Sequence, residues 1–578
     1  MRTILSLFTV LLLSLLDACQ TKPALKPAPA NSTGTISFCA PKTVILNTEP
    51  GHDGSLVPLF WGLTDNFTYP VTTKSKAAQK FFDQGLVLSY GFNHAEAARS
   101  FREAARLDPD CAMAYWGLAY VLGPNYNVGM DPSTLPAALE AIEQARARMH
   151  TGTPKEQLLI KTIAKRYPKS KNEDPKPHYQ AYADAMKTAY QQYPDDLDLA
   201  AMTAEALMDM HPWDLYEKNG QPKAWTPEII TIIEKVLAKN PRHPQAIHLY
   251  IHATEASADP ERAIPYAKTL ERLIRGAGHL VHMPSHTYIN TGHYHEGTLA
   301  NERAVKIDSL YVETCHEGGF YPLVLYPHNW HFLTASAALE GRGRRSLEAS
   351  RYMAAHVVDK KMMYEPSMSL FQHFYTIPWY IMVKFAMWDD ILREPKPDPA
   401  LPLATAIWHY AQGMAHSGKG NFAAAEKALQ VVKKMESDTT IAKMVLFDIN
   451  KATEIVRIAH LVLEGDIAHR KGNLPQAVDL FQKAVAVEDG LNYNEPPDWF
   501  FSVRHPLGDV LLKAGRYREA ESVFRKDLEE YKNNGWALMG LYQSLLKQGG
   551  RAKEAAAVHE RFKKAWQWAE VKLESSAL

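Results

Sequence analysis

The feature that most constrains the fold is a spacing pattern in residues 78–111. Over a period of 34 residues, small side chains fall at positions 8, 20 and 27, as Gly85, Ala97 and Ala104. Small residues at these positions let two antiparallel helices approach closely, and the large residues between them fill the remaining space. Pro109 then ends the second helix, because the residue before a proline disfavours helical geometry. The pattern predicts a helix–turn–helix unit.

The same template fits residues 458–491 and 501–534, and weaker copies start near residues 112, 197, 244, 278, 327, 406 and 535. A single hairpin of this kind cannot bury its apolar face, so neighbouring copies stack on one another. We therefore expect an all-α fold, an α-solenoid of stacked helical hairpins with a concave groove. The expected arrays are residues 77–392 and 403–570, preceded by an irregular cap at 37–76.

The first residues have the pattern of an export signal. Arg2 precedes the apolar run Ile4 to Leu16, which is too short to span a bilayer. The run ends in Leu16-Asp17-Ala18-Cys19, which resembles a bacterial lipobox although Asp17 is an unusual occupant. The expectation is a lipoprotein signal peptide at 1–18, lipidation at Cys19 and a flexible tether at 19–36, with the protein lipid-anchored at the bacterial cell envelope. A plain cleaved signal peptide is the alternative.

Three other cysteines, Cys39, Cys111 and Cys315, form no Cys-x-x-Cys pair, which excludes a zinc ribbon or thioredoxin-type site. Export permits one disulfide, and the sequence leaves its pairing open. Basic and acidic residues number 64 each, so the formal net charge of zero gives no global attraction to nucleic acid. The common nucleotide-binding and serine-hydrolase motifs have no match in the chain.

Histidines carry the strongest functional signal. His248 and His252 are four residues apart, and His282 and His286 repeat that spacing 34 residues later. Residues at i and i+4 share a helix face, so matched pairs on neighbouring hairpins predict a cluster of imidazoles in the groove. Imidazole ligands suit a transition metal such as zinc, copper or iron. The full set of predicted metal ligands is His248, His252, His279, His282, His286, His328 and His331.

Two acidic residues at groove positions of their repeats, Glu205 and Glu255, are candidate ligands, supporting partners or catalytic bases. Two alternatives stay open. Histidines on one helix face are often core or solvated residues bonded to their neighbours. Pro284 can also begin a helix of its own, which would separate His282 from His286.

Further residues are candidates for contact with a small-molecule or peptide ligand in the groove. Some lie in Gly123-Pro124-Asn125-Tyr126-Asn127, for which a capping turn is the alternative. Others lie in a segment at 493–505 that breaks the repeat spacing, for which a packed connector between repeats is the alternative. One lies on an aromatic helix face. The residues are Trp116, Asn125, Asn127, Glu495, Trp499 and Arg504.

The chain also resembles a family of bacterial tetratricopeptide lipoproteins. The resemblance covers roughly residues 60–560 and rests on blocks such as Gly278-His279-Leu280-Val281-His282-Met283-Pro284-Ser285-His286 and Glu495-Pro496-Pro497-Asp498-Trp499. It implies the repeat fold and leaves the activity open. Two functions from different classes are therefore expected. One is a metal-binding protein or metal-dependent enzyme with its site in the groove, and the other is a non-catalytic scaffold that binds a peptide, a protein or a glycan.

Overall fold

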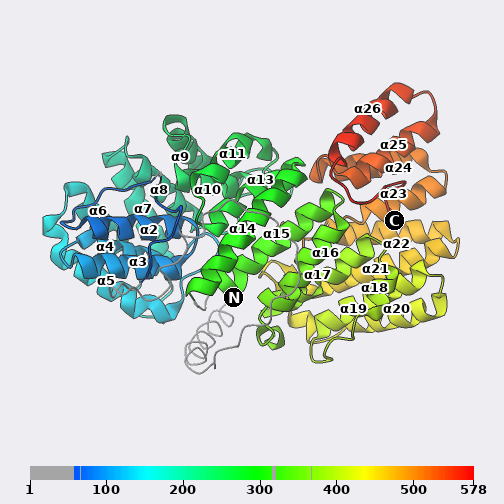
Figure 1. Cartoon of the computed structure of the whole chain (residues 1–578), viewed down its shortest axis with the longest axis horizontal. Coiled ribbons are helices and arrows are strands. Elements are labelled where there is room, and N and C mark those ends of the chain that lie inside the picture. The colour runs from blue at the N-terminus through cyan, green and yellow to red at the C-terminus, as the bar shows by residue number, and fades with distance from the viewer. Residues whose placement is uncertain (1–56, 66, 316–319, 366–367) are drawn as a thin grey trace, which may run out of the picture. The chain divides into compact units, whose positions relative to one another are not determined.

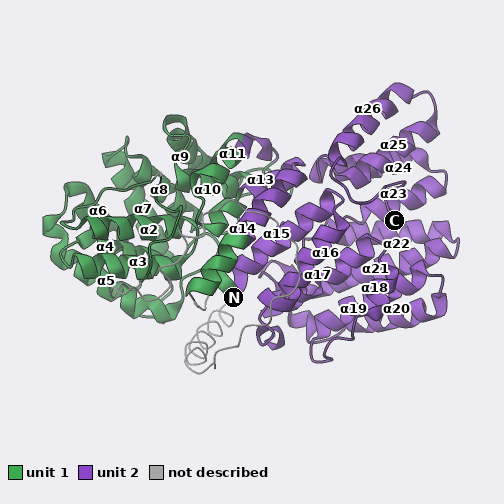
Figure 2. Ribbon diagram, viewed as in Figure 1, with its two compact units in different colours: residues 1–257, 265–283, 306–322 green, residues 258–264, 284–305, 323–578 purple. Residues whose placement is uncertain are grey.

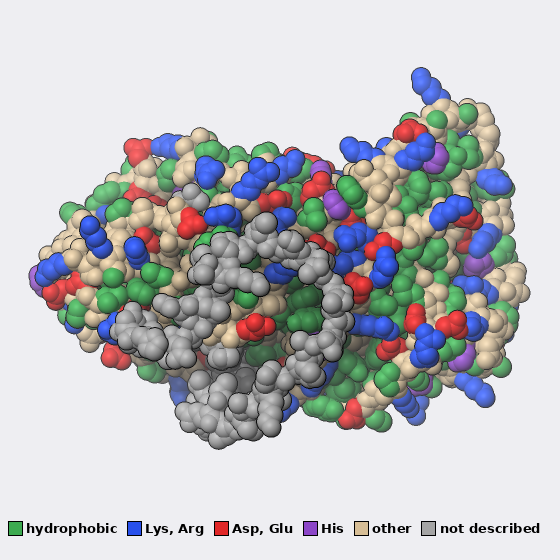
Figure 3. All heavy atoms as spheres, viewed as in Figure 1, with side chains coloured by type: hydrophobic (Ala, Val, Ile, Leu, Met, Phe, Trp, Pro, Cys, Tyr) green, Lys and Arg blue, Asp and Glu red, His purple; other side chains and the backbone are tan. Residues whose placement is uncertain are grey.

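The computed structural model describes residues 57–65, 67–315, 320–365 and 368–578 (Figure 1). The predicted signal peptide, the tether, Cys19 and Cys39 lie outside these residues. Within them, no helix is both long enough and apolar enough to cross a membrane. On the face shown in Figure 3, basic and acidic side chains are interspersed, in keeping with the zero formal charge.

The chain divides into two compact units (Figure 2). Unit 1 comprises residues 1–257, 265–283 and 306–322, and unit 2 comprises residues 258–264, 284–305 and 323–578. The helices that flank the expected connector at 393–402, α18 (Trp388–Arg393) and α19 (Pro402–Gly418), both belong to unit 2 and contact each other. The division into units therefore does not follow the two expected arrays.

Unit 1 consists of helices joined by turns and longer loops. These are α2 (Lys76–Tyr90), α3 (His94–Leu107), α4 (Ala112–Val121), η1 (Pro132–Thr134), α5 (Leu135–Arg148), η2 (Met149–Thr151), α6 (Pro154–Ile163), α7 (Lys176–Gln192), α8 (Leu197–Met208), α9 (Thr226–Lys239), α10 (Pro244–Thr254) and α12 (Gly278–His282). Three further elements have residues in both units: α11 (Ile264–Leu273), α14 (Tyr294–Cys315) and η4 (Tyr321–Leu325).

Unit 2 is also helical, apart from one short hairpin. Its helices are η3 (Pro260–Ala263), α13 (Pro284–Thr291), α15 (Tyr326–Leu339), α16 (Gly343–Tyr352), η5 (Met353–Val357), η6 (Met362–Tyr364), α17 (Ser369–Lys384), α18, α19, α20 (Phe422–Glu436), η8 (Ile441–Lys443), α21 (Ala452–Arg470), α22 (Leu474–Glu488), α23 (Arg504–Lys513), α24 (Tyr517–Glu530), α25 (Gly535–Gln548) and α26 (Ala552–Ala565). The strands β1 (Val445–Leu446) and β2 (Asn450–Lys451) pair antiparallel, with Val445 opposite Lys451.

The helical hairpins confirm the all-α repeat fold. Helices α2 and α3 pack against each other, and the fully buried Phe101 of α3 lies against Gly85 of α2 and Gly117 of α4. A Cβ atom on Gly85 would lie 2.9 Å from the Phe101 ring, and one on Gly117 would lie closer still. The small residues of the repeat are therefore required because a phenylalanine occupies the space that their side chains would need.

We expect Gly117→Ala to destabilise the chain by about 1–3 kcal/mol, because the added methyl group overlaps the Phe101 ring in a closed core. Urea unfolding followed by circular dichroism measures this change. The matched control is Gly129→Ala, where nothing lies within 4 Å of the added Cβ. Equal midpoints for the two variants would contradict the packing role of Gly117.

The helix boundary at Pro284 decides between the two alternatives for the second histidine pair. Helix α12 ends at His282 and α13 begins at Pro284, so His282 and His286 lie on different helices. A proline has no backbone N–H to continue the helix, and its ring clashes with the preceding turn. The two histidines therefore do not lie on one continuous helix.

Candidate functional site

Three histidines of unit 1 lie together and form what we call the N-cluster: His248, His252 and His279. His248 and His252 are one turn apart on α10, and His279 lies on α12. Their side chains are almost completely buried, at 1–2% exposure. Each offers a ring nitrogen within 4.8 Å of the nitrogens of the other two. Such a group of buried imidazoles can hold a metal ion.

Helix α10 places its two histidines through its own local sequence. The His243 side chain caps the helix by accepting a hydrogen bond from the Ala246 N–H, and Pro244 occupies the first turn, where a missing N–H costs nothing. The helix then extends through Thr254 with all its residues buried. The spacing of four residues therefore directs both imidazoles to one side.

The ring spacings of the N-cluster are close to those of a metal site. With metal–nitrogen bonds of about 2.0–2.1 Å, two imidazoles on a tetrahedral ion have ring centroids about 5 Å apart. The centroid distances are 4.9 Å for His248–His252 and 5.1 Å for His248–His279. The third pair, His252–His279, is wider at 6.4 Å. Two pairs thus have the spacing of two ligands of one tetrahedral ion, and the third pair is wider than that spacing by about 1 Å.

Two partners orient the α10 histidines. The Nδ1 atom of His248 is hydrogen-bonded to the Tyr90 carbonyl, and Nδ1 of His252 lies 3.0 Å from Glu255 Oε1. When Nδ1 donates to an oxygen, the ring lone pair is at Nε2, which is the usual arrangement of a metal-ligating histidine. Glu255 therefore acts as an orienting carboxylate for His252, one of the roles predicted for it.

Aromatic side chains form an apolar wall around the N-cluster. The Phe92 ring lies 4.6 Å from His248 and 5.5 Å from His279, while Tyr126 and Trp213 lie 5.3 Å and 5.7 Å from His252. Phe92 and Trp213 both have φ of 55°, a left-handed conformation that is uncommon for bulky residues. Such strain is often kept at functional sites. The sequence carries no signal for these residues, because neither their conformation nor their contacts are local.

The second predicted acidic residue, Glu205, belongs to a different network of unit 1. Its Oε2 atom accepts hydrogen bonds from the Tyr120 hydroxyl and from Gln245 Nε2, the latter at 3.1 Å. Burial raises the pKa of Glu205 well above its usual value, and the charge of Asp209 raises it further. Asp209 in turn is ion-paired with Arg166 at 2.7 Å.

A second group, which we call the C-cluster, lies in unit 2 and consists of His286, His328 and Glu495. The Nε2 atoms of the two histidines are 3.4 Å apart. His286 Nδ1 lies 2.7 Å from Glu495 Oε2, whose other oxygen accepts a hydrogen bond from Asn290. Two ligand atoms on a tetrahedral ion are about 3.3 Å apart, and a carboxylate on the far nitrogen is the typical support of such a ligand. The two Nε2 atoms of the C-cluster therefore have the spacing of two ligands of one tetrahedral ion.

The two remaining predicted ligands are His282 and His331. His282 lies on α12, with its ring centroid 5.6 Å from that of His279. His331 is packed against His373, with ring centroids 5.5 Å apart, and against Phe374 and Phe500. Burial, above all, lowers the pKa of His331 well below its usual value, so this imidazole is neutral.

Most of the predicted groove residues are structural. Trp116 is 1% exposed and stacks on Tyr120, so it is a core residue rather than a ligand platform. Asn125 accepts hydrogen bonds from the N–H groups of Asn127 and Val128, as a capping turn requires. The buried Arg504 binds both oxygens of Asp489, which leaves its guanidinium engaged in the fold.

Trp499 and Cys111, which the sequence analysis also named, are both buried. Trp499 is 4% exposed and borders a cavity of unit 2 of about 100 Å³. Cys111 is a buried free thiol, and burial raises its pKa to about 11, which favours the less reactive thiol form over the thiolate.

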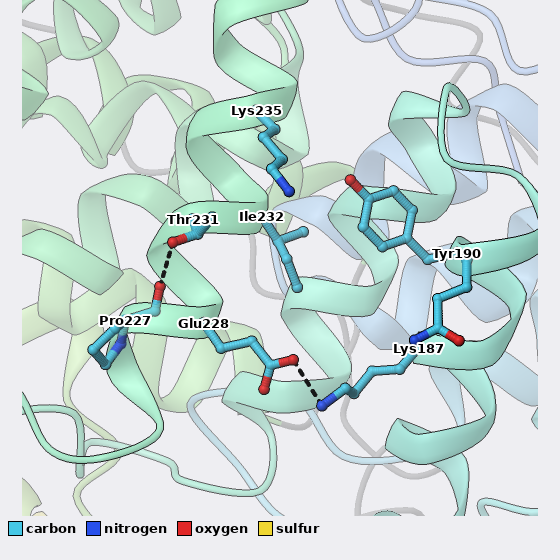
Figure 4. Close-up of a pocket in the computed structure, with 8 residues that line it drawn as sticks. Lys187, Tyr190, Pro227, Glu228, Thr231, Ile232 and Lys235 are labelled. Atoms are coloured by element: carbon cyan, nitrogen blue, oxygen red, sulfur yellow. Dashed lines mark hydrogen bonds and ion pairs between the residues drawn. The ribbon is translucent and has the colours of Figure 1, made fainter.

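A groove of about 380 Å³ lies between α7 and α9 of unit 1, away from every predicted site residue (Figure 4). Its lining includes Tyr190, Ile232 and Lys235, and an ion pair of 2.7 Å joins Lys187 to Glu228. The groove is open to solvent, and the exposed ion pair between Lys187 and Glu228 contributes little.

Comparison with known proteins agrees with the repeat architecture. A family model described as tetratricopeptide repeat matches residues 82–122, which include the α2–α3 hairpin and the start of the next. Such repeats form extended surfaces that bind peptide or protein partners. No curated protein matches the chain.

Several solved structures resemble the chain weakly over most of its length. The human IFIT1 dimer with m7Gppp-AAAA has 11% sequence identity, with 86% of this chain and 91% of that chain covered, at a TM-score of 0.28. Yeast Tom70 has 13% identity, coverages of 85% and 91%, and a TM-score of 0.27. The TPR domain of P58(IPK) has 13% identity, coverages of 84% and 99%, and a TM-score of 0.22. Likeness at this level carries no conclusion about function.

Proposed function

We propose that this tetratricopeptide-repeat protein binds a transition-metal ion through the N-cluster. The observation that carries the proposal is the convergence of three buried imidazole nitrogens within 4.8 Å of one another, from two helices of unit 1. Two of the three rings also have partners that orient Nε2 as the ligand atom.

The ligand set limits the choice of metal. Three neutral imidazoles suit zinc, copper or iron, whereas magnesium and calcium require oxygen ligands. A set of three protein ligands leaves a fourth tetrahedral position, which in catalytic zinc sites holds water or substrate. A metal held by these three histidines would act as a Lewis acid and would lower the pKa of a water bound to it to about 7. The wall of Phe92, Tyr126 and Trp213 keeps bulk water away from the imidazoles.

The second candidate function is a scaffold that binds a peptide or protein partner without catalysis. The observation that favours it is the repeat architecture itself, confirmed by the hairpins and by the family match at residues 82–122. In that case a metal in the N-cluster would only tie α10 to α12, and its removal would change stability without abolishing an activity. The scaffold function does not depend on a metal, so the two functions differ in whether removal of a metal abolishes the activity.

The test is metal uptake by the full chain after treatment with a chelator. We expect the metal-free protein to bind one zinc ion tightly at the N-cluster. Zinc binding should raise the melting temperature, because a ligand that binds the folded state stabilises it. Cobalt(II) in place of zinc should give the intense visible absorption of tetrahedral coordination. Elemental analysis that finds negligible metal in the isolated chain, together with no uptake of zinc, copper or iron, would refute the proposal.

A further inference from the structure

The C-cluster belongs to unit 2 alone and has no residue in common with the N-cluster. Its two histidines lie in the first turns of different helices, His286 in α13 and His328 in α15. A proline in each of these turns, Pro284 and Pro327, suits the start of a helix and so helps to place the histidine that follows it. Glu495 comes from the segment between α22 and α23. The cluster therefore brings together three segments that are distant in the sequence.

The spacing of the two imidazoles fits two ligands of one ion better than a direct hydrogen bond. Their Nε2 atoms are 3.4 Å apart, which is longer than the about 2.7–3.2 Å of a typical hydrogen bond from an N–H group. Two nitrogens bound to one tetrahedral ion are about 3.3 Å apart. The ring centroids are 5.5 Å apart, within about 0.5 Å of the spacing of two imidazoles on such an ion. Each ring therefore directs its Nε2 atom toward the other ring.

A carboxylate favours the lone pair of His286 on the nitrogen that faces His328. Glu495 Oε2 lies 2.7 Å from His286 Nδ1, and both side chains are almost completely buried. An anion at this distance favours the proton on Nδ1, so Nε2 keeps its lone pair. Asn290, one turn after His286 on α13, donates a hydrogen bond to the other carboxylate oxygen. The helix that carries the histidine thus also holds the carboxylate in place.

The surroundings of the C-cluster hold the two rings and leave one of them accessible. The centre of the Phe332 ring, one turn after His328 on α15, lies 4.4 Å from that of His286 and 4.9 Å from that of His328. His286 is 1% exposed, whereas His328 is partly exposed. Solvent therefore reaches the cluster at His328, so water or an oxygen ligand can take a further position on an ion bound there.

The donor types and the charge of the C-cluster suit zinc. Imidazole nitrogens are ordinary zinc ligands, whereas calcium and magnesium prefer oxygen. The carboxylate of Glu495, one ring away from the ligand nitrogen, offsets part of the charge of a divalent ion. Because the C-cluster offers one imidazole fewer than the N-cluster, we expect it to bind zinc less tightly.

We propose that the C-cluster is a second zinc site, which exchanges its metal more readily than the N-cluster and keeps a position for an oxygen ligand. His286 and His328 bind the ion through Nε2, and Glu495 orients His286. An open position distinguishes zinc sites that bind an added ligand from structural sites, in which the protein supplies every ligand. The proposal does not rest on the N-cluster, because the two clusters have no residue in common.

The experiment uses the full chain with His279→Ala, in which the N-cluster lacks a ligand. Competition against a chromophoric chelator measures its zinc affinity, and cobalt(II) replaces zinc for spectroscopy. We expect this variant to bind one zinc ion. Acetohydroxamate, which binds metals through two oxygens, should change the visible spectrum of the cobalt(II) form, because a position on the ion is open. Negligible zinc binding, or a cobalt(II) spectrum that acetohydroxamate leaves unchanged, overturns the proposal.

Two further substitutions in the same chain assign the zinc to the C-cluster. His328→Ala removes a ligand and should lower the zinc affinity at least about 100-fold, while Glu495→Gln keeps the shape of the side chain and should lower it about 10–100-fold. The matched control is His356→Ala, which removes an exposed histidine of unit 2 and should leave the affinity unchanged.

Circular dichroism checks that each variant is folded, and the isosteric Glu495→Gln keeps the test decisive if His328→Ala does not fold. Unchanged zinc affinity in both C-cluster variants overturns the proposal, and so does an equal loss of affinity in the His356→Ala control.

Discussion

His279→Ala is expected to lower the zinc affinity of the N-cluster at least about 100-fold. His279 is the N-cluster ligand contributed by α12. Its removal leaves the two histidine ligands of α10 and takes away the ligand on the α12 side of the site. Changing a residue that merely supports a ligand already costs about 10–100-fold in metal affinity, so the loss of a ligand costs at least as much. Competition of the metal-free protein against a chromophoric chelator measures the effect.

Two variants make this experiment specific. His150→Ala removes an exposed histidine of the same unit and should keep the wild-type affinity. His328→Ala removes a member of the C-cluster and should leave the tight N-cluster site intact, because His328 is not one of the three N-cluster histidines. If His279→Ala bound zinc as tightly as the wild type, the three-histidine site would be wrong. If His328→Ala alone lost the metal, the site would have to be assigned to the C-cluster.

Arg166→Met is expected to destabilise the chain by about 3–5 kcal/mol, because it removes one partner of a buried ion pair. Arg166 is 2% exposed and binds Asp209 Oδ2 at 2.7 Å. Its guanidinium also donates to the carbonyls of Tyr120 and Pro124, at 2.9 Å and 2.7 Å. The substitution leaves a carboxylate and two carbonyl oxygens buried without these donors. Urea unfolding measures the loss.

The pH dependence of this variant has a definite sign. Burial raises the pKa of Asp209 to about 7, and Arg166 opposes that rise, so the pKa rises further in the variant. A carboxyl whose pKa is higher in the folded state favours folding while it is protonated, and this contribution is lost as the pH rises through the folded pKa. The stability gap between variant and wild type should therefore widen from pH 5 to pH 8.

The control for this prediction is Arg146→Met, which removes an exposed ion pair with Glu143. Surface pairs contribute about 0–1 kcal/mol, so the control should stay near the wild type at every pH. A loss of less than 1 kcal/mol for Arg166→Met at pH 8 would show that the buried carboxylate finds another partner.

The repeat fold was predictable because its determinants are local. The period of 34 residues places Phe101 against Gly85, and the same positions of a later copy place Phe524 against Gly508. Each contact joins a helix to its neighbour in the chain, so residue size and spacing suffice to indicate it. The compact units were not predictable, since they depend on how successive hairpins pack together.

The candidate site was predictable only in part. The spacing of His248 and His252 on α10 follows from the helical period and is confirmed by the structure. The sequence left open whether His282 and His286 share a helix, and in the structure Pro284 begins a new one. The pairing of His286 with Glu495 joins residues more than two hundred positions apart, and no local pattern contains that information.

By itself, then, the sequence determined the hairpins, the helix that carries His248 and His252, and the abundance of imidazoles nearby. Only the tertiary structure decided that His279 completes the N-cluster, that Phe92 and Trp213 enclose it, and that Trp116 and Arg504 serve the fold. The physical reason is the range of the interactions. Helix period and residue size act within one hairpin, whereas metal-site geometry, burial and the loss of solvent around a charge depend on segments that meet only after folding.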